Sequence, residues 1–242
     1  MAEVTKFRFG NTYPDDLYVG NSLADRVYYG SELVYGFAPP IQIELVEIIS
    51  FTNDTGGAIP NYVDDTHFGI LLEMSAVNVV FGTQPGWTLV GDYSFSAYRI
   101  AASFKKFEIS DRGTNISFIS SPTVNDYDQL YIFRNLDGNT ITDVFYGNYD
   151  FSNSTNTNIS INSPTINPDQ GAISFHYFYT NSTTFAATSN PSSDQVVDHS
   201  NFDYVASQYK IWNGPNNDPI NTVYGVSGSD PTIQIAFWII IE

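Results

Sequence analysis

The stretch that determines the fold lies just before Glu242 and reads Ile233-Gln234-Ile235-Ala236-Phe237-Trp238-Ile239-Ile240-Ile241. Every second residue of this stretch is Ile or Phe, which is the period of a β-strand with one face toward a core. Trp238 and Ile240 make much of the other face apolar as well, so we predict that this strand is central in its sheet. The stretch is far too short to cross a bilayer.

Shorter stretches of the same kind recur upstream, separated by turn chemistry such as Asp137-Gly138-Asn139 and Asn190-Pro191. Their apolar faces are Ile41, Ile43, Leu45; Phe68, Ile70, Leu72, Met74; Tyr98, Ile100, Ala102, Phe104; and Ile173, Phe175, Tyr177, Tyr179. Glu47 breaks the alternation of the first stretch and predicts a β-bulge or the end of pairing there. Many short strands of this kind indicate an all-β fold of two facing antiparallel sheets.

The composition agrees with this prediction. Apolar residues make up 42% and charged residues 14% of the 242 residues, with 18 Phe, 17 Tyr and only 2 Met. Aromatic and β-branched residues favour strands. No stretch has apolar residues at helical spacing over a helical length.

Pro39-Pro40 gives the best domain boundary, because neither proline can donate to a strand ladder. We therefore predict two parts: a small N-terminal β-meander over residues 1–38, and a β-sandwich over residues 39–242. The meander consists of three short aromatic units that each end at a glycine turn. It is too small to bury much area alone, and it is expected to pack on a neighbour.

Charge and cysteine content exclude several partners. The formal net charge is −17, which would repel nucleic acid and anionic lipid surfaces. The chain has no cysteine, so disulfides and thiol chemistry are excluded. No signal peptide or spanning segment is evident, and we expect synthesis in the cytoplasm of a host cell with no membrane insertion.

Catalytic motifs are not found. There is no Gly-x-Ser-x-Gly elbow and no phosphate-binding glycine loop. His67 and His199 lie beside acidic residues, and His176 is expected to point outward or to be half-buried on its strand. We interpret all three as structural, and we expect a non-enzymatic protein without catalytic residues, bound metal or cofactor.

One ordered set of motifs resembles a known family. It consists of Phe68-Gly69-Ile70-Leu71-Leu72, Gln84-Pro85-Gly86-Trp87-Thr88, Tyr98-Arg99-Ile100-Ala101, Asn115-Ile116-Ser117-Phe118, Gly171-Ala172-Ile173-Ser174-Phe175 and Ile235-Ala236-Phe237-Trp238. This order is similar to a jelly-roll domain common in phage tail, fibre and baseplate proteins. The resemblance implies a jelly-roll β-sandwich in a bacteriophage virion structural protein of the appendage or head-decoration type. It also implies a homo-oligomer, often a trimer, located in the virion. A structural turn is the favoured role of Pro85-Gly86-Trp87, ahead of a sugar-stacking role for Trp87.

Two functions remain open. In the first, the protein is a structural component of a phage particle that contacts other virion proteins, and Tyr18, Tyr28, Tyr29 and Tyr35 form an assembly interface. In the alternative, it binds a carbohydrate or host receptor through aromatic residues in turn-rich stretches, with Tyr146, Tyr149 and Trp212 touching a host surface glycan.

Overall fold

The computed structural model is an all-β protein whose sheets are antiparallel. It describes the backbone of four short N-terminal strands and, in the rest of the chain, residues 41–52, 57–75, 85–95, 98–116, 126–152, 158–166, 170–180, 186–198, 205–212, 221–227 and 232–242. The one helix in these segments is a three-residue 3-10 turn, η1 (Ile109–Asp111).

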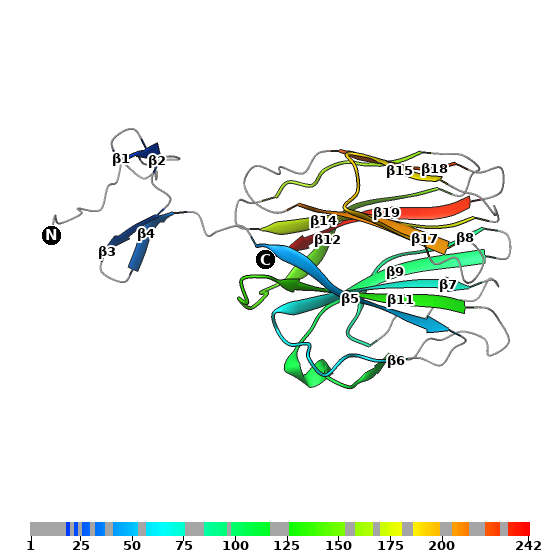
Figure 1. Ribbon diagram of the computed structural model, residues 1–242, viewed down its shortest axis with the longest axis horizontal. Helices are drawn as coiled ribbons and strands as arrows, with labels where there is room; N and C mark the ends of the chain where they lie inside the picture. Colours follow the sequence, from blue (N-terminus) through cyan, green and yellow to red (C-terminus); the bar gives the residue numbers. More distant parts are fainter. Residues whose placement is uncertain are drawn as a thin grey trace.

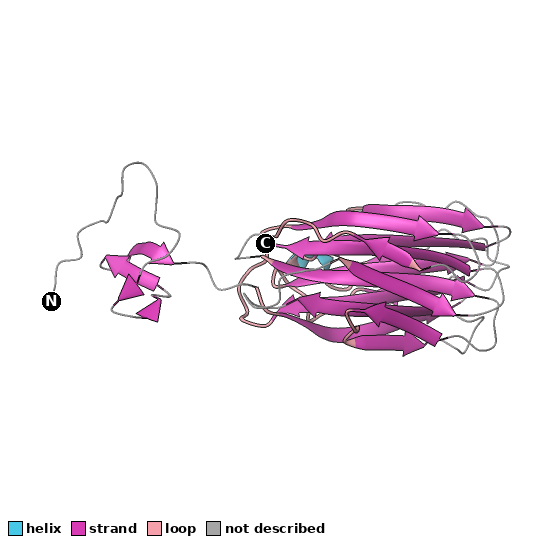
Figure 2. Cartoon of the chain, turned by 90° about the horizontal axis from the view of Figure 1, so that it is seen from above, coloured by secondary structure: helices cyan, strands magenta, loops and turns pink. Residues whose placement is uncertain are grey.

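Two five-stranded sheets face each other and form the body of the molecule (Figures 1 and 2). The first has the spatial order β5-β11-β7-β9-β8, with bounds Ile43–Thr52, Asp126–Asn135, His67–Ser75, Tyr98–Lys106 and Thr88–Phe95. The second has the order β12-β19-β14-β17-β16, with bounds Val144–Ser152, Thr232–Ile241, Gly171–Thr180, Val205–Trp212 and Gln195–Asp198. The predicted central strand is confirmed, because β19 lies between β12 and β14.

The sandwich is therefore confirmed, but the jelly-roll winding is not. A jelly roll sends successive strands to alternate sheets. Here the first five-stranded sheet takes all its strands from residues 43–135, and the second takes all its strands from residues 144–241. The chain passes between the sheets once among these ten strands, through the short connection 136–143.

The two sheets repeat the same topology. Numbered within its own half, each sheet has the spatial order first, fifth, second, fourth, third. The registers also match across the strands. One row of paired residues crosses the first sheet as Ile48, Tyr131, Ile70, Phe104 and Thr88. The matching row crosses the second as Tyr149, Phe237, Phe175, Tyr209 and Gln195.

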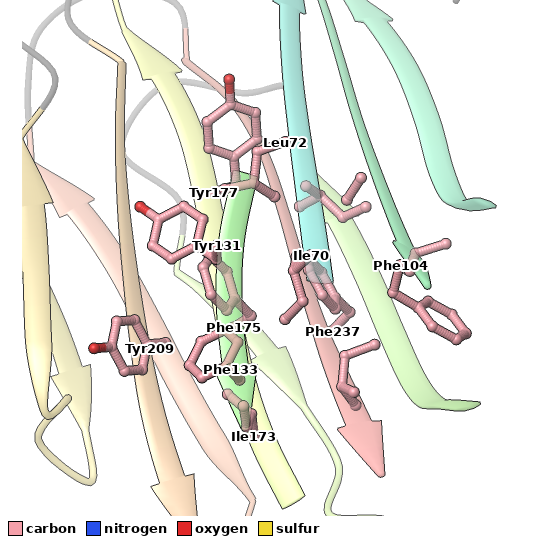
Figure 3. Close-up of a cluster of buried hydrophobic side chains, with 14 of the residues drawn as sticks. Ile70, Leu72, Phe104, Tyr131, Phe133, Ile173, Phe175, Tyr177, Tyr209 and Phe237 are labelled. Atoms are coloured by element: carbon pink, nitrogen blue, oxygen red, sulfur yellow. The ribbon is translucent and has the colours of Figure 1, made fainter. Parts of the chain in front are cut away.

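The main core fills the space between the two sheets and combines aliphatic side chains with many aromatic rings (Figure 3). Tyr131 of the first sheet packs edge-on against Phe175 of the second, with ring centroids 5.0 Å apart. Phe133 meets Tyr209 at 5.6 Å, and Phe175 stacks on Phe237 within its own sheet at 5.5 Å. These contacts use the alternating faces that the sequence predicts, because side chains at every second position point to the same side of a strand.

Further layers cover the outer faces of both sheets. On the first sheet, β6 (Gly57–Ala58) pairs with β10 (Asn115–Ile116) and covers a cluster that includes Trp87 and Phe107. On the second, the sheet β13-β18-β15 covers Trp212 and Trp238 and contributes Tyr224 to the same cluster; its strands span Ile159–Ile161, Thr222–Ser227 and Ala186–Asn190. Strands β7, β14 and β19 are consequently buried along both faces.

Two local predictions are confirmed. The pairing of β5 with β11 shifts by one residue where Leu45 and Glu47 face Phe133 and Ile132, so a bulge lies at the broken alternation. Trp87 is buried after the turn at Pro85-Gly86 and packs edge-on against Phe107 at 6.0 Å, and Gly86 has a φ of 77°, which favours glycine.

The N-terminal segment differs in detail from the predicted meander. β1 (Tyr18–Val19) pairs with β2 (Ser22–Leu23), and β3 (Arg26–Tyr29) pairs with β4 (Glu32–Gly36), in two separate two-stranded sheets. The predicted interface residues Tyr18, Tyr28, Tyr29 and Tyr35 lie on these strands, but their side chains are outside the described part of the structure.

Candidate functional site

A row of aromatic side chains lies along one side of the sandwich, where edge strand β8 of the first sheet meets edge strand β12 of the second. We call Tyr93, Tyr146, Tyr149 and Phe151 the aromatic edge. Tyr93 stacks on Phe151 with ring centroids 3.9 Å apart and an interplanar angle of 8°. Tyr93 also approaches Tyr149 at 6.5 Å, and Tyr149 approaches Tyr146 at 6.0 Å. The four rings therefore form one continuous group supplied by both sheets.

A β-bulge brings two of these tyrosines to the same face. In a regular strand, residues three apart point to opposite faces. The pairing of β12 with β19 shifts between Tyr146 and Tyr149, which face Ile239 and Phe237. The extra residue restores both tyrosines to the side that faces the first sheet. Gly147 fits this bulge because a Cβ atom there would lie 3.0 Å from Cβ of Pro164 and 3.3 Å from Cβ of Trp238.

The two tyrosines are unusually open to solvent for residues on this side of the sheet. Tyr146 is 40% exposed and Tyr149 is 47% exposed. The matching positions of the first half, by register, are Leu45 and Ile48, which pack as partly buried residues against the main core. The second half therefore places exposed aromatic rings where the first half places aliphatic side chains. This difference makes the aromatic edge the best candidate for a functional surface.

The surroundings of this surface keep the Tyr93 hydroxyl protonated by raising its pKa. Burial raises the pKa of the Tyr93 hydroxyl, and a hydrogen bond with Tyr149 and the nearby charge of Asp150 raise it further. The guanidinium of Arg99 on β9 forms two hydrogen bonds to the carboxylate of Asp92, the neighbour of Tyr93 on β8. The aromatic edge thus combines a protonated Tyr93 hydroxyl with the exposed rings of Tyr146 and Tyr149.

Such an arrangement is suited to binding a neutral ligand. An exposed tyrosine presents an apolar ring face and a hydroxyl that can donate and accept a hydrogen bond. The apolar face of a sugar ring can stack on it while sugar hydroxyls bond to the phenol. The negative surroundings disfavour an anionic ligand.

Trp212, the third residue predicted to touch a glycan, does not lie on this surface. Its ring is 7% exposed, its Nε1 donates to Oγ of Ser174 at 3.1 Å, and it packs against Trp238 at 5.5 Å. Lys210 lies over the ring, with Nζ 5.3 Å from the ring centroid. Trp212 therefore presents no open face to a sugar and belongs to the layer between β17 and the outer sheet.

Two of the three histidines, His67 and His176, are buried. Asp64 accepts hydrogen bonds from the backbone N–H and the hydroxyl of Thr66 and lies 2.8 Å from Nδ1 of His67. Burial raises the pKa of Asp64, but these hydrogen bonds outweigh it and lower the pKa to about 2. His176 is completely buried, which corrects the prediction of an outward or half-buried residue: its strand face is the outer one, but the sheet β13-β18-β15 covers it. His199 lies outside the described residues.

No group of three or more His, Asp or Glu side chains in the described segments is arranged to hold a metal ion. In the same segments, no helix is long and apolar enough to cross a membrane.

Sequence reasoning named Tyr146 and Tyr149 but missed Tyr93 and Phe151. The composition near residue 146 suggested a turn, whereas these residues lie on an edge strand. The apposition of β8 and β12 is a tertiary feature. The spacing Tyr146-Gly147-Asn148-Tyr149, with a glycine between two aromatic residues, is the sequence signal that indicates the bulge.

Comparison with known protein families, with curated proteins and with solved structures found no match for this chain.

Proposed function

We propose that the protein is a non-enzymatic binding module that recognises a neutral carbohydrate through the aromatic edge. The observation that carries this proposal is the continuous group of Tyr93, Tyr146, Tyr149 and Phe151, two members of which are 40% and 47% exposed. The rigid sheets position these rings before a ligand arrives, so binding would cost little ordering of the protein.

The test is a glycan array followed by calorimetry on the strongest neutral oligosaccharide. The variant Tyr146→Ala/Tyr149→Ala should weaken binding about tenfold or more, since each stacked ring contributes on the order of 1 kcal/mol. Tyr62→Ala is the matched control, because Tyr62 is also exposed (42%) but lies outside the aromatic edge and donates its hydroxyl to Glu47. The proposal fails if the unmodified protein binds no neutral glycan, or if the double variant binds as well as the control.

A second function concerns assembly. The strands before Pro39 pair only with one another in the described structure, in sheets of two strands each. Isolated two-stranded sheets are marginal in water, and this favours a role for residues 1–38 in docking onto other proteins. Together with the resemblance to phage appendages, it supports the proposal of a virion structural component that is incorporated as a homo-oligomer, its tyrosine-rich front segment contacting other virion proteins.

Removal of residues 1–37 tests this second role. The full-length protein should be a homo-oligomer by light scattering and should enter particles, whereas the truncated protein should do neither while keeping its β-sheet circular dichroism. Normal incorporation of the truncated protein would exclude docking through this segment. An electron micrograph of labelled particles would show whether the protein occupies the head, tail or fibre.

A further inference from the structure

We infer that the sandwich is a fused dimer: residues 42–136 and 143–242 are two copies of one five-stranded module, and the partner that fits the core face of each module is a second copy of the same fold. The identical strand order and matching registers of the two sheets are the first reason. Three further correspondences are independent of strand order.

The bulges correspond. In the first half, the pairing of β5 with β11 shifts between Leu45 and Glu47, opposite Phe133 and Ile132. In the second, the pairing of β12 with β19 shifts between Tyr146 and Tyr149. Both bulges place one extra residue on the first strand of the half. Each lies directly before the residue of that strand in the matching row, which is Ile48 in the first half and Tyr149 in the second. A shared irregularity of this kind is stronger support for equivalence than shared regular pairing, because bulges are specific local features.

The ends of the two halves correspond as well. Leu136 donates its backbone N–H to the carbonyl oxygen of Gln42 at 2.7 Å. Glu242 donates its backbone N–H to the carbonyl oxygen of Asp143 at 3.0 Å. Each bond joins the residue after the last strand of a half to the residue before its first strand. The short outer strands agree: β6 pairs with β10, and β13 pairs with β18, in each case joining the insertion after the first strand to the insertion before the last.

Some contacts between the halves come in reciprocal pairs, as an approximate two-fold axis requires, whereas β8 approaches β12 and β19 more closely than the matching strand β16 approaches β5 and β11. Tyr131 on the last strand of the first half packs against Tyr209 on the fourth strand of the second, and β19 contacts β9 in the reverse sense. Phe104 on the fourth strand of the first half meets Tyr146 on the first strand of the second at 6.3 Å, and β17 contacts β5 in return. Each module thus uses the same face to bind the other.

A chain with the halves in reverse order tests this inference. An approximate two-fold axis makes the span from Glu242 to Gln42 similar to the span from Leu136 to Asp143, which residues 137–142 bridge. Joining residues 1–41, 143–242, 137–142 and 42–136 in that order uses every residue once. Every junction then lies at a position equivalent to its original one.

The reordered chain should fold, with the near-ultraviolet circular dichroism of the original and one cooperative transition. Its melting temperature should fall by no more than about 15 °C, a decrease that allows for the altered surroundings of buried Ile141. A second version with six additional Gly and Ser residues in the joining segment removes any effect of a strained connection. Failure of both versions to fold would overturn the inference. So would a crystal structure in which the rotation that superposes residues 43–135 on residues 144–241 is far from 180°.

Discussion

The hydroxyl of Tyr131 in the first sheet is hydrogen-bonded to the hydroxyl of Ser207 in the second, in the middle of the buried core. The Tyr131 hydroxyl also donates a hydrogen bond to Oε1 of Gln129 at 3.3 Å. A polar contact between two apolar faces specifies how the sheets align, because any sliding of one sheet over the other leaves these buried groups without their partners.

Replacing Tyr131 with Phe should therefore lower the free energy of unfolding by about 1–3 kcal/mol, since Ser207 stays buried and loses a hydrogen-bond partner. The double variant Tyr131→Phe/Ser207→Ala should recover part of this loss. Urea unfolding of the four proteins in a double-mutant cycle measures the coupling. Purely additive effects would show that the contact does not link the sheets energetically.

Much of this architecture follows from the sequence. The alternation of Ile233 to Ile241 identifies a strand that is buried on both faces, and the broken alternation at Glu47 identifies a bulge, because both depend on the two-residue period of a single strand. The turn at Pro85-Gly86 likewise depends only on local backbone chemistry.

The structural repetition of the two halves, by contrast, cannot be recognised in the amino-acid sequence. At register-equivalent positions of β9 and β17, the identical residues are Ala101 with Ala206 and Lys105 with Lys210. A core face tolerates exchange among Ile, Phe and Tyr provided that volume and pattern are kept, so sequence identity is lost while register persists. Strand order is also a long-range property, and a list of strands does not contain it.

Burial by outer layers explains why the exposure of single residues was predicted wrongly. The alternation predicts that His176 points away from the main core, and the structure confirms this. The third sheet, however, converts that outer face into a second core. Trp212 is covered in the same manner. Alternation reports which face a residue occupies, and it carries no information on whether another layer covers that face.

Close packing on the outer side of the first sheet leads to a second prediction. A Cβ atom on Gly69 would lie 2.5 Å from Cζ of Phe107 and 3.1 Å from Cδ1 of Leu130. Gly69→Ala should lower the free energy of unfolding by about 1–3 kcal/mol, because the buried Phe107 ring has to move. Addition of Phe107→Leu should restore part of the stability, as measured by thermal unfolding. An unchanged melting temperature for Gly69→Ala would contradict the tight fit.

The ion pair behind the aromatic edge gives a third prediction. The side chains of Arg99 and Asp92 are only 16% and 12% exposed. Arg99→Met should cost about 2–4 kcal/mol, since the carboxylate of Asp92 stays in a largely buried position without its positive partner. Arg99→Met/Asp92→Leu should be more stable than the single variant. Chemical unfolding at pH 7 compares them, and a single variant as stable as the original protein would show that solvent satisfies Asp92.

The last prediction concerns acid and His176. Gln208 donates from Nε2 to Nδ1 of His176 at 3.0 Å, and Nε2 of His176 donates to Oε1 of Gln234 at 2.9 Å. The ring lies between Phe178 and Tyr224, with centroids 5.1 Å and 4.9 Å away. A second ring proton would point at an amide that is itself a donor. Burial lowers the pKa of His176 from 6.5 to about 3, although the bond to Gln234 opposes this shift.

Because the pKa is lower in the folded state, the unfolded chain takes up the proton first as the pH falls below 6.5. Stability is therefore lost progressively between pH 6.5 and about 3. At pH 4 the free energy of unfolding is lower by about 3 kcal/mol, because each pH unit below 6.5 removes 1.36 kcal/mol. Unfolding by urea between pH 7 and pH 4 should show this loss, and His176→Gln should lack this contribution while being less stable at pH 7. Proton NMR of the His176 ring provides the direct measurement. A ring that titrates near pH 6 in the folded protein would mean that water or movement of the outer sheet accommodates the charge.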